Sequence, residues 1–442
     1  MRRTAFASGR NVCFAVLASA LLTGFGPAPD AVRAQLTGAP PSVGISVATL
    51  DDGRSDVRSY GVSFDGDSPF EIGSITKTFT ATLLADMVVR HEVAPDDPIE
   101  RYLPPVATVP TFEGRHITLA ELATQSSGLP RMPTNWMPAN SDDPYDYDDA
   151  KLLAFLASYK LTRAPAEAFE YSNLGFGLLG YLLARRLGVD YATAIRTRIL
   201  QPLGMSNTVV ETRDRIVHTV GGHNADGDAT RNWQFAALAG AGAIVSTPND
   251  MLRYARANLD DTRGPLAAAM QLAQHPVRAA EGKRRIGFAW ITLPDGIVWH
   301  NGGTAGFRTF LGLDRPHKRA IVVLANGFID AVDALGLHAL DSDVPLPPTP
   351  QSDVRLDAGV LRRYVGRYRF SDGSTGVVTR DDHGLIVSFD MPVFRARLHP
   401  RSENDFATRL PVLDVRFDGS DVKMMMIVSQ LGQQPDTGTR EP

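Results

Sequence analysis

The stretch Phe70-Glu-Ile-Gly-Ser-Ile-Thr-Lys-Thr-Phe79 decides how we interpret the rest of the chain. It places Ser74 three residues before Lys77, where an extended, glycine-punctuated segment changes to the apolar spacing of a helix that ends near Arg90. Residues three apart on a helix are neighbours, so we expect the Lys77 amine to reach the Ser74 hydroxyl. A buried lysine can lose its proton near neutral pH and then accept one from serine. The stretch therefore predicts an activated serine nucleophile.

The spacing alone is a weak signal, because Ser-x-x-Lys is a common tetrapeptide. Ser420 and Lys423 repeat it in a strand-like segment near the C-terminus that has no companion motif. A serine nucleophile also needs a base, an oxyanion hole and an orienting group. The rest of the chain must therefore supply those partners.

The composition is that of a globular protein with two or three domains. The chain has 442 residues, of which 43% are hydrophobic and 21% charged. Its formal net charge is −4 and it has no basic run. Nucleic acid is therefore not an expected partner.

The first 34 residues predict an export signal that is removed. Three arginines precede a short apolar run at 12–22, and Val32-Arg-Ala34 offers a small-residue cleavage site. The run is too short to span a bilayer as a mature helix. The only cysteine, Cys13, lies in it, so the mature chain would have neither a disulfide nor a thiolate metal site. We expect a periplasmic or secreted protein without a mature transmembrane segment.

Strand patterns lie at both ends of residues 40–340, and helical patterns lie between them. The strands are expected as a hairpin at 42–64 and as runs at 285–292, 297–301, 307–313 and 319–326. After the Ser74 helix, further helices are expected at 149–158, up to Leu187, at 191–200 and at 247–259. This order predicts an α/β (α+β) domain over 35–342, in which an antiparallel sheet is assembled from both ends of the region. Helices would cover the sheet, and a helical lobe would be inserted.

A second, smaller domain is expected after a Pro-rich linker at 343–352. Short alternating runs and turns over 353–432 indicate a small all-β domain, either a barrel or a sandwich. The polar residues 433–442 are expected to form a flexible tail.

Gly175, Gly177 and Gly180 match the dinucleotide-binding pattern Gly-x-Gly-x-x-Gly. No buried strand pattern precedes them and no βαβ pattern surrounds them, so we reject nucleotide binding. The glycines instead predict close packing of a helix.

Tyr171-Ser-Asn173 is the first candidate partner of the nucleophile. The Tyr171 hydroxyl can shuttle a proton between Ser74 and a leaving group, and the Asn173 amide can contact Lys77 and a substrate amide. The alternative is a tyrosine that merely packs on a Gly-rich helix.

The segment Trp299–Phe307 is the second candidate. Gly302 and Gly303 leave room for a substrate backbone beside the strand. The amides of Gly303 and Ser74 can then form an oxyanion hole. The alternative is a Gly-rich hairpin turn.

Together, Ser74-Ile-Thr-Lys77, Tyr171-Ser-Asn173 and His300-Asn-Gly302 resemble the three signature elements of the penicillin-recognising serine hydrolases. The resemblance is nearest to the class C β-lactamase and DD-peptidase branch, whose second element is Tyr-x-Asn. It extends to Leu122–Pro130 and covers about residues 40–330.

The resemblance implies a β-lactamase/DD-peptidase-like fold: an antiparallel sheet flanked by helices, an all-helical lobe, and the site in the cleft between them. It implies an acyl-enzyme on Ser74, activation by Lys77 and Tyr171, and neither a metal nor a cofactor. The oxyanion and substrate-binding residues that it implies are Gly303, Asn173, His300, Gly302 and Gln125. The downstream β domain resembles the barrel-like appendages of D-aminopeptidase and esterase relatives.

His300 departs from the pattern of most β-lactamases, which have lysine at this position. Lysine offers a fixed positive charge to a substrate carboxylate, whereas an unperturbed histidine is mostly neutral at pH 7. Histidine also occurs there in DD-peptidases, D-aminopeptidases and esterases of the family. We therefore expect inefficient β-lactam hydrolysis with covalent reaction retained, and Arg308 is a candidate for the missing charge.

The leading functional hypothesis is an exported serine hydrolase that acts on D-amino-acid cell-wall peptides, as a DD-peptidase or D-aminopeptidase, and/or on β-lactams. A promiscuous carboxylesterase of the same fold is the alternative, and the loops near 131–147 and 232–240 would shape the acyl pocket that distinguishes the two. A non-catalytic penicillin-binding sensor or scaffold is the alternative from another class. The sequence predicts no oligomeric state.

Overall fold

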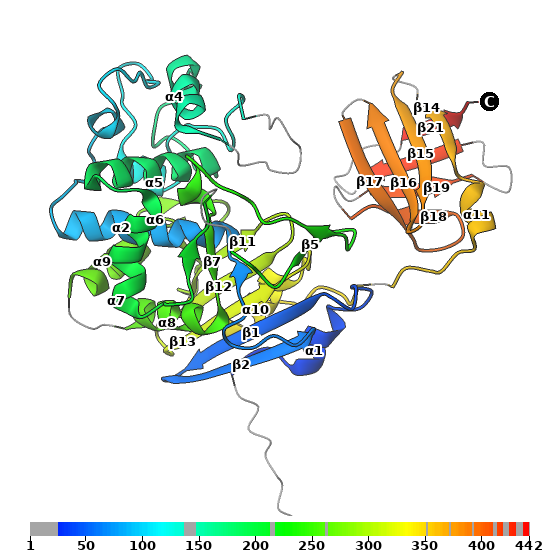
Figure 1. Cartoon of the computed structure of the whole chain (residues 1–442), viewed down its shortest axis with the longest axis horizontal. Coiled ribbons are helices and arrows are strands. Elements are labelled where there is room, and N and C mark those ends of the chain that lie inside the picture. Colours follow the sequence, from blue (N-terminus) through cyan, green and yellow to red (C-terminus); the bar gives the residue numbers. More distant parts are fainter. Residues whose placement is uncertain are drawn as a thin grey trace, which may run out of the picture.

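The computed structural model describes residues 25–136, 147–212, 217–260, 264–350, 352–370, 373–390, 393–409, 413–418, 424–429 and 436–441. A large body of mixed helices and strands is followed by a separate β-barrel at the C-terminal end (Figure 1).

The body is built on an eight-stranded antiparallel sheet. Its strands are β1 (Gly44–Asp51), β2 (Arg54–Gly61), β8 (Arg278–Ala279), β9 (Arg285–Ile286), β10 (Ile291–Thr292), β11 (Val298–Gly303), β12 (Arg308–Asp314) and β13 (Arg319–Ala325). Their order is β2-β1-β13-β12-β11-β10-β9-β8. The N-terminal hairpin pairs with the last strand, with Ile45 opposite Ala325. The predicted sheet, assembled from both ends of the region, is confirmed.

Helices cover both faces of this sheet. They are α1 (Pro29–Ala34), α2 (Thr76–Val89), α8 (Pro248–Leu259), α9 (Pro265–Gln274) and α10 (Val332–Leu340). Along β13, Val322 and Leu324 face the core that contains α2, α8 and α9. Ile321 and Val323 face the core that contains α10 and part of α1. Side chains that alternate along a strand thus divide the body into two apolar layers.

The apolar spacing of helix α2 indicated one buried face. In the structure the helix is buried on all sides. Its residues from Thr76 to Met87 are all buried, because the helix runs between α9 and the helical lobe (Figure 1). Its threonines find partners there: Thr80 Oγ1 donates to the Gly240 carbonyl at 2.8 Å. Hydrogen bonds of this kind allow polar side chains to be buried at little cost.

The predicted helical lobe lies beyond α2. Its elements are η2 (Ile99–Tyr102), α3 (Leu119–Ala123), α4 (Asp149–Ser158), α5 (Asn173–Leu187), α6 (Tyr191–Ile195), the π-helical turn η3 (Arg196–Leu200), α7 (Gln201–Leu203) and η4 (Ala239–Ala241). A Cβ at Gly177 would lie 2.5 Å from the Leu238 side chain, and one at Gly180 would lie 2.9 Å from Gly240 Cα. These glycines let α5 pack directly on η4, as predicted when nucleotide binding was rejected.

Short strands connect the sheet to the lobe. β3 (Phe70–Glu71), β7 (Ile244–Ser246) and β4 (Val209–Val210) form a three-stranded sheet, and β5 (Gly222–His223) pairs with β6 (Ala229–Thr230). β3 leads into the 3₁₀ turn η1 (Gly73–Ile75), which precedes α2.

The C-terminal domain is a closed barrel, which decides between the barrel and the sandwich left open by the sequence. After α11 (Ala358–Arg362), its strands are β14 (Gly366–Arg369), β15 (Thr375–Asp381), β16 (Gly384–Asp390), β17 (Val393–Pro400), β18 (Asp405–Ala407), β19 (Leu413–Phe417), β20 (Met424–Ser429) and β21 (Asp436–Arg440). Aromatic residues such as Tyr368, Phe406 and Phe417 fill its interior.

Strand β21 lies where a flexible tail was expected. It pairs with β20 and β14 and so closes the barrel. The segment is polar, but its pairing uses backbone groups, and a Cβ at Gly438 would lie only 2.8 Å from the Phe370 ring. A strand held in this way needs no apolar pattern of its own.

Helix α1 lies inside the segment predicted to be removed. Val32 is fully buried, and Arg33 lies over the Tyr60 ring with its Cζ 5.6 Å from the centroid. Cleavage before Gln35 would therefore take α1 out of the core. Residues 1–24, which hold the basic and apolar parts of the predicted signal, lie outside the described residues. Among the described helices, none has the length and apolar character needed to cross a membrane.

Candidate active site

Ser74 lies in the tight turn η1, immediately before α2. The residue before it, Gly73, has a φ of 52°, a backbone conformation that favours glycine. A Cβ at Gly73 would also lie 2.7 Å from the Gly303 nitrogen. The two glycines thus bring the serine turn against the end of β11.

Lys77 contacts Ser74 as predicted. Its Nζ lies 2.9 Å from Ser74 Oγ and 2.7 Å from the Ala241 carbonyl oxygen, and the residue is 0% exposed. Burial, together with the nearby positive charge of Arg131, lowers the pKa of Lys77 well below its ordinary value. In the neutral amine the bond reverses, so that the Ser74 hydroxyl donates to Nζ. This is the arrangement that a lysine general base needs.

Tyr171 also reaches Ser74. Burial raises the pKa of Tyr171 to about 12, although its hydrogen bond with Ser74 and the charge of Arg131 act in the opposite direction. Its ring contacts two basic side chains, with Lys77 Nζ and Arg131 Cζ each 5.0 Å from the ring centroid. At neutral pH Tyr171 is a protonated phenol, which can donate and pass on a proton.

Gln125 contacts the segment that carries Tyr171, and its predicted substrate-binding role stays a prediction. Its Oε1 accepts a hydrogen bond from the Ser172 amide at 2.6 Å, and its carbonyl accepts one from the Glu170 amide at 2.7 Å. The side chain is buried, and Gln125 is not among the described residues that line the cleft beside Ser74. The amide oxygen of Gln125 thus supports the segment that carries Tyr171, whereas its buried Nε2 has no hydrogen-bond partner among the described residues.

A cleft of about 560 Å³ opens beside Ser74. It is lined by Ser74, Arg131, Phe169, Tyr171, Asn173, Trp233, Ala280, Glu281, Arg284, Ile291, Trp299, Asn301, Gly302, Gly303, Thr304 and Arg308. One cleft is thus lined by the nucleophile candidate Ser74, Tyr171, Asn173, both glycines of β11 and Arg308. Of the predicted loops, residues 137–146 lie outside the described residues, whereas Trp233 belongs to the cleft.

His300 lies beneath the cleft rather than on its surface. It is 1% exposed, and its Nδ1 lies 2.6 Å from the Asn301 carbonyl oxygen. A carbonyl only accepts, so Nδ1 carries the proton and Nε2 the lone pair. Burial, and then the charge of Lys77, lower the pKa of His300 to about 3, although the Asn301 carbonyl acts in the opposite direction. His300 is therefore neutral and supplies no charge for a substrate carboxylate.

Gly302 and Gly303 set the distance between β11 and the serine turn. A Cβ at Gly302 would lie 2.0 Å from the Ile72 carbonyl oxygen, so only glycine fits there. Asn173, on the opposite side, donates from Nδ2 to the Met132 sulfur at 3.6 Å. The predicted oxyanion hole, formed by the amides of Ser74 and Gly303, stays a prediction, and the close approach of the two segments is consistent with it.

Arg308 lines the cleft but is partly engaged. Its Nη1 donates to the carbonyls of Thr304 and Phe307, each at 2.9 Å, and its Cζ lies 3.6 Å from the centroid of the Phe328 ring. Burial lowers the pKa of Arg308 to about 10, although the charges of Asp330 and Asp333 raise it. Arg308 is thus still a cation at neutral pH.

Two further cations of the cleft were missed in the sequence. Arg131 and Arg284 are exposed, and neither forms an ion pair with any described residue. Arg131 directly follows the quoted Leu122–Pro130 segment, so its position was detectable. Arg284 lies over the Trp299 ring from an irregular segment with no sequence pattern.

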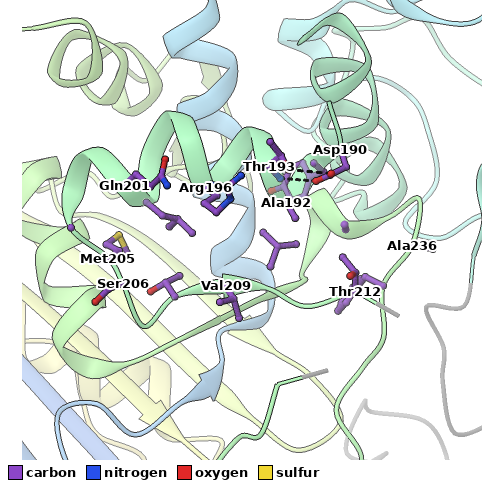
Figure 2. A pocket seen from close by; sticks show the side chains of 17 residues that line it. Asp190, Ala192, Thr193, Arg196, Gln201, Met205, Ser206, Val209, Thr212 and Ala236 are labelled. Carbon is purple, nitrogen blue, oxygen red and sulfur yellow. Dashed lines mark hydrogen bonds between the residues drawn. The ribbon is translucent and has the colours of Figure 1, made fainter. Parts of the chain in front are cut away.

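A second hollow, of about 890 Å³, lies away from Ser74 between α6, η3, β4 and the segment that leads into η4 (Figure 2). Its residues include none of the predicted site residues. Its acidic group, Asp190, already caps α6 by accepting from the amide and hydroxyl of Thr193. The hollow is larger than the cleft at Ser74 but carries no comparable chemistry.

Comparisons with known proteins agree with this geometry. The beta-lactamase family model matches residues 32–344. Penicillin-binding protein 4* of Bacillus subtilis is 27% identical over 401 residues, which cover 84% of this chain and 87% of that protein. The D-alanyl-D-alanine-carboxypeptidase/endopeptidase AmpH of Escherichia coli is 30% identical over 297 residues, which cover 62% of this chain and 76% of that protein.

Solved structures share the fold. A beta-lactamase/D-alanine carboxypeptidase from Yersinia pestis has a TM-score of 0.62 at 24% identity and covers 72% of this chain and 95% of that chain. An octameric penicillin-binding protein homologue from Pyrococcus abyssi has a TM-score of 0.60 at 19% identity and covers 93% of this chain and 98% of that chain. Class C β-lactamases also match, with a TM-score of 0.59. The chain therefore belongs to the β-lactamase family of serine hydrolases.

Proposed function

We propose that this protein is an exported acyl hydrolase that forms an acyl-enzyme on Ser74 from D-amino-acid cell-wall peptides and from β-lactams. The observation that carries the proposal is the 2.9 Å contact between Ser74 Oγ and Nζ of the fully buried Lys77. Few other roles require an uncharged lysine beside a serine at the start of a buried helix.

In the proposed mechanism, Lys77 takes the Ser74 proton as Oγ attacks the substrate carbonyl. The amides of Ser74 and Gly303 stabilise the oxyanion that develops. Tyr171, which is hydrogen-bonded to Ser74 and lies beside Lys77, donates its proton to the leaving nitrogen and regains one from protonated Lys77, so that the amine departs neutral and Lys77 is again a base. Water then repeats the sequence on the acyl-enzyme, with the same groups activating it and releasing Ser74.

The charges of the cleft support anionic substrates. The lining of the cleft contains three arginines, Arg131, Arg284 and Arg308, and one acidic residue, Glu281. The inner groups Lys77 and His300 are uncharged because their pKa values are lowered. A cleft with an excess of cations raises the local concentration of anions. Peptides with a free carboxylate and β-lactams are anionic, whereas a simple ester is not. Two relatives, a penicillin-binding protein and a D-alanyl-D-alanine-carboxypeptidase/endopeptidase, agree with this substrate class.

The test compares the protein with its Ser74→Ala variant on a peptide ending in D-alanyl-D-alanine, a chromogenic cephalosporin and a neutral chromogenic ester. We expect slow cephalosporin turnover, measurable peptide cleavage, and loss of all three activities in the variant with an unchanged circular dichroism spectrum. Ser63→Ala, at an exposed loop position, is the matched control. Turnover that persists in Ser74→Ala would contradict the proposal. Rapid cleavage of the ester alone would favour a carboxylesterase, and an adduct without any turnover would favour a sensor.

Export is also a proposal. It is supported by the basic and apolar pattern of the N-terminal segment. Because α1 packs in the core, we also propose that signal cleavage leaves residues 25–34 in the mature protein. The intact mass of the protein recovered from the periplasm or medium tests both points. A chain that begins at Gln35 would contradict the second, because it would lack the buried Val32.

A further inference from the structure

We propose that the C-terminal barrel is a positioning domain for the active-site cleft: through His399 and Arg409 it holds the β5–β6 turn, which supports the turn between Gly303 and Arg308. The proposal uses the cleft described above and does not depend on which substrate it accepts.

The first step is the contact between the barrel and the body. His399, at the end of β17, is 6% exposed and lies between two carboxylates. Its Nε2 is 3.2 Å from Oδ1 of Asp226, in the β5–β6 turn, and its Nδ1 is 2.8 Å from Oδ2 of Asp353, just after the linker. A neutral imidazole has only one N–H, whereas both nitrogens here face acceptors. The geometry is therefore that of an imidazolium between two aspartates.

Arg409 makes a second contact with the same turn. Its Nη1 donates to the Ala225 carbonyl at 3.0 Å, and its Nη2 lies 3.5 Å from Asp353. Two side chains of the barrel thus hold two successive residues of the turn, one by charge and one by a backbone hydrogen bond. Contacts that are both charged and buried fix geometry more firmly than exposed ones.

The second step leads from this turn to the cleft. Strand β5 lies directly on the turn between β11 and β12: the His223 amide donates to the Gly306 carbonyl at 3.2 Å. A Cβ at Gly222 would lie 2.7 Å from the Phe307 ring and 2.9 Å from Gly306 Cα. The two segments are in direct contact at these residues, so a displacement of β5 would also move the Gly303–Arg308 turn.

A second path runs through residues 328–331. Phe328 lies under Arg308 on one side, and with Asp330 it lines a hollow of about 600 Å³ that also contains His399 and Arg409 on the other. The Asp330 carboxylate interacts electrostatically with both cations: burial raises its pKa, and the charges of Arg308 and Arg409 each lower it. The position of the barrel is thus coupled to the guanidinium in the cleft.

The contacts of His399 and Arg409 with the β5–β6 turn, called the joint from here on, have a defined pH dependence. The charged groups that face His399 are Asp226, Asp353 and Arg409, with Arg397 and Asp228 beside Asp226. The two aspartates raise the pKa of His399 above its ordinary value, against burial and Arg409. Docking is therefore favoured while His399 is protonated and is lost as the pH rises through its raised pKa.

The experiment uses the full-length protein and two readouts. The radius of gyration, from small-angle X-ray scattering, reports docking without requiring activity. The values of kcat and KM on an anionic cephalosporin report positioning. We expect His399→Gln to increase the radius of gyration and to raise KM about fivefold with little change in kcat, a typical coupling between sites. The wild type should approach the radius of gyration and KM of the variant at high pH, whereas the radius of gyration of the variant should not change with pH.

The controls separate the possible explanations. His383→Gln changes an exposed histidine of the same barrel and should behave as wild type. Asp226→Asn breaks the joint from the body side, so it serves if His399→Gln does not fold, and the double variant should be no worse than either single one. A compact His399→Gln protein, or one that opens while KM is unchanged, would overturn the proposal. If Ser74→Ala retained activity, the proposed chemistry would fail, but the docking result would stand.

Discussion

The active-site cleft and the joint between body and barrel each contain one buried histidine, and the two differ in charge: His300 is neutral, whereas His399 is an imidazolium. His300 is 1% exposed and His399 6%, so burial alone does not distinguish them. His300 faces a carbonyl on one side and a lysine on the other, and its pKa falls to about 3. His399 faces two carboxylates, and its pKa rises.

Burial lowers the pKa of both histidines, and only the two carboxylates beside His399 overcome that effect. In the cleft, two potential cations are held in their neutral forms, which frees Lys77 to act as a base. At the joint, one cation is stabilised between two anions, which makes it a link between domains. The following predictions test this contrast, beginning with the largest expected effect.

Lys77→Arg keeps a long cationic side chain but removes the ability to become neutral, because arginine stays protonated. We expect acylation by a penicillin to slow by about a thousandfold, the range of general-base catalysis. Stopped-flow kinetics or intact-protein mass against time measures it. Lys160→Arg, on an exposed lysine, is the matched control. A variant within about tenfold of wild type would mean that Lys77 is not the base.

Gly302→Ala tests the contact between β11 and the serine turn. Its Cβ would lie 2.0 Å from the Ile72 carbonyl oxygen, so the strand must move away from Ser74. We expect kcat/KM to fall about a hundredfold, the usual cost of a displacement of about 1 Å in an active site. Gly359→Ala, where the nearest atom to a Cβ is 3.9 Å away, should have no effect. Normal activity in Gly302→Ala would show that the two segments need not be so close.

His300→Gln should cost about tenfold in kcat/KM, because it changes shape and hydrogen bonding but not charge. Since the pKa of His300 is about 3, the variant should keep the wild-type pH profile between about pH 5 and pH 8. Activity in both proteins should be lost as the pH falls through the lowered pKa of Lys77, because protonated Lys77 is no base. A limb of the profile that disappears in His300→Gln would mean that His300 titrates.

Arg131→Gln is expected to have the smallest effect. It should lower kcat/KM about fivefold on an anionic cephalosporin and leave a neutral ester nearly unchanged, because the charge attracts anions and is only the smaller cause of the lowered pKa of Lys77. The difference between the two substrates should shrink at high salt. Arg54→Gln, far from the cleft, is the control. Equal losses on both substrates would assign Arg131 a structural role instead.

Much of the fold was predictable because it is encoded locally. The β1–β2 hairpin, the late strands and the helices at 149–158 and 247–259 follow hydrophobic periodicity and turn residues. α9 and α10 were missed. In α10, Gly336 interrupts the pattern because a Cβ there would overlap the Phe310 ring, at 2.1 Å. Glycine is required at this position by contact with a residue distant in sequence, and a local sequence pattern does not reveal such a contact.

The same distinction applies to the site. Ser74 and Lys77 share one turn of helix, so their contact could be predicted from spacing. Gln125 could be placed near Tyr171, but its supporting role depends on which amide its oxygen meets 47 residues away. The joint at His399 unites groups 173 and 46 residues apart, and no motif marks any of them. These contacts exist only once the chain has folded.

The most direct test of the account is the rate at which a penicillin acylates the wild-type protein across a range of pH, with the adduct mapped by peptide mass. The account predicts one adduct, on Ser74, that forms faster as the pH rises through the lowered pKa of Lys77 and then at a constant rate until Tyr171 ionises near its pKa of about 12. An adduct on another residue, or a rate that rises only near the ordinary pKa of lysine, would contradict it.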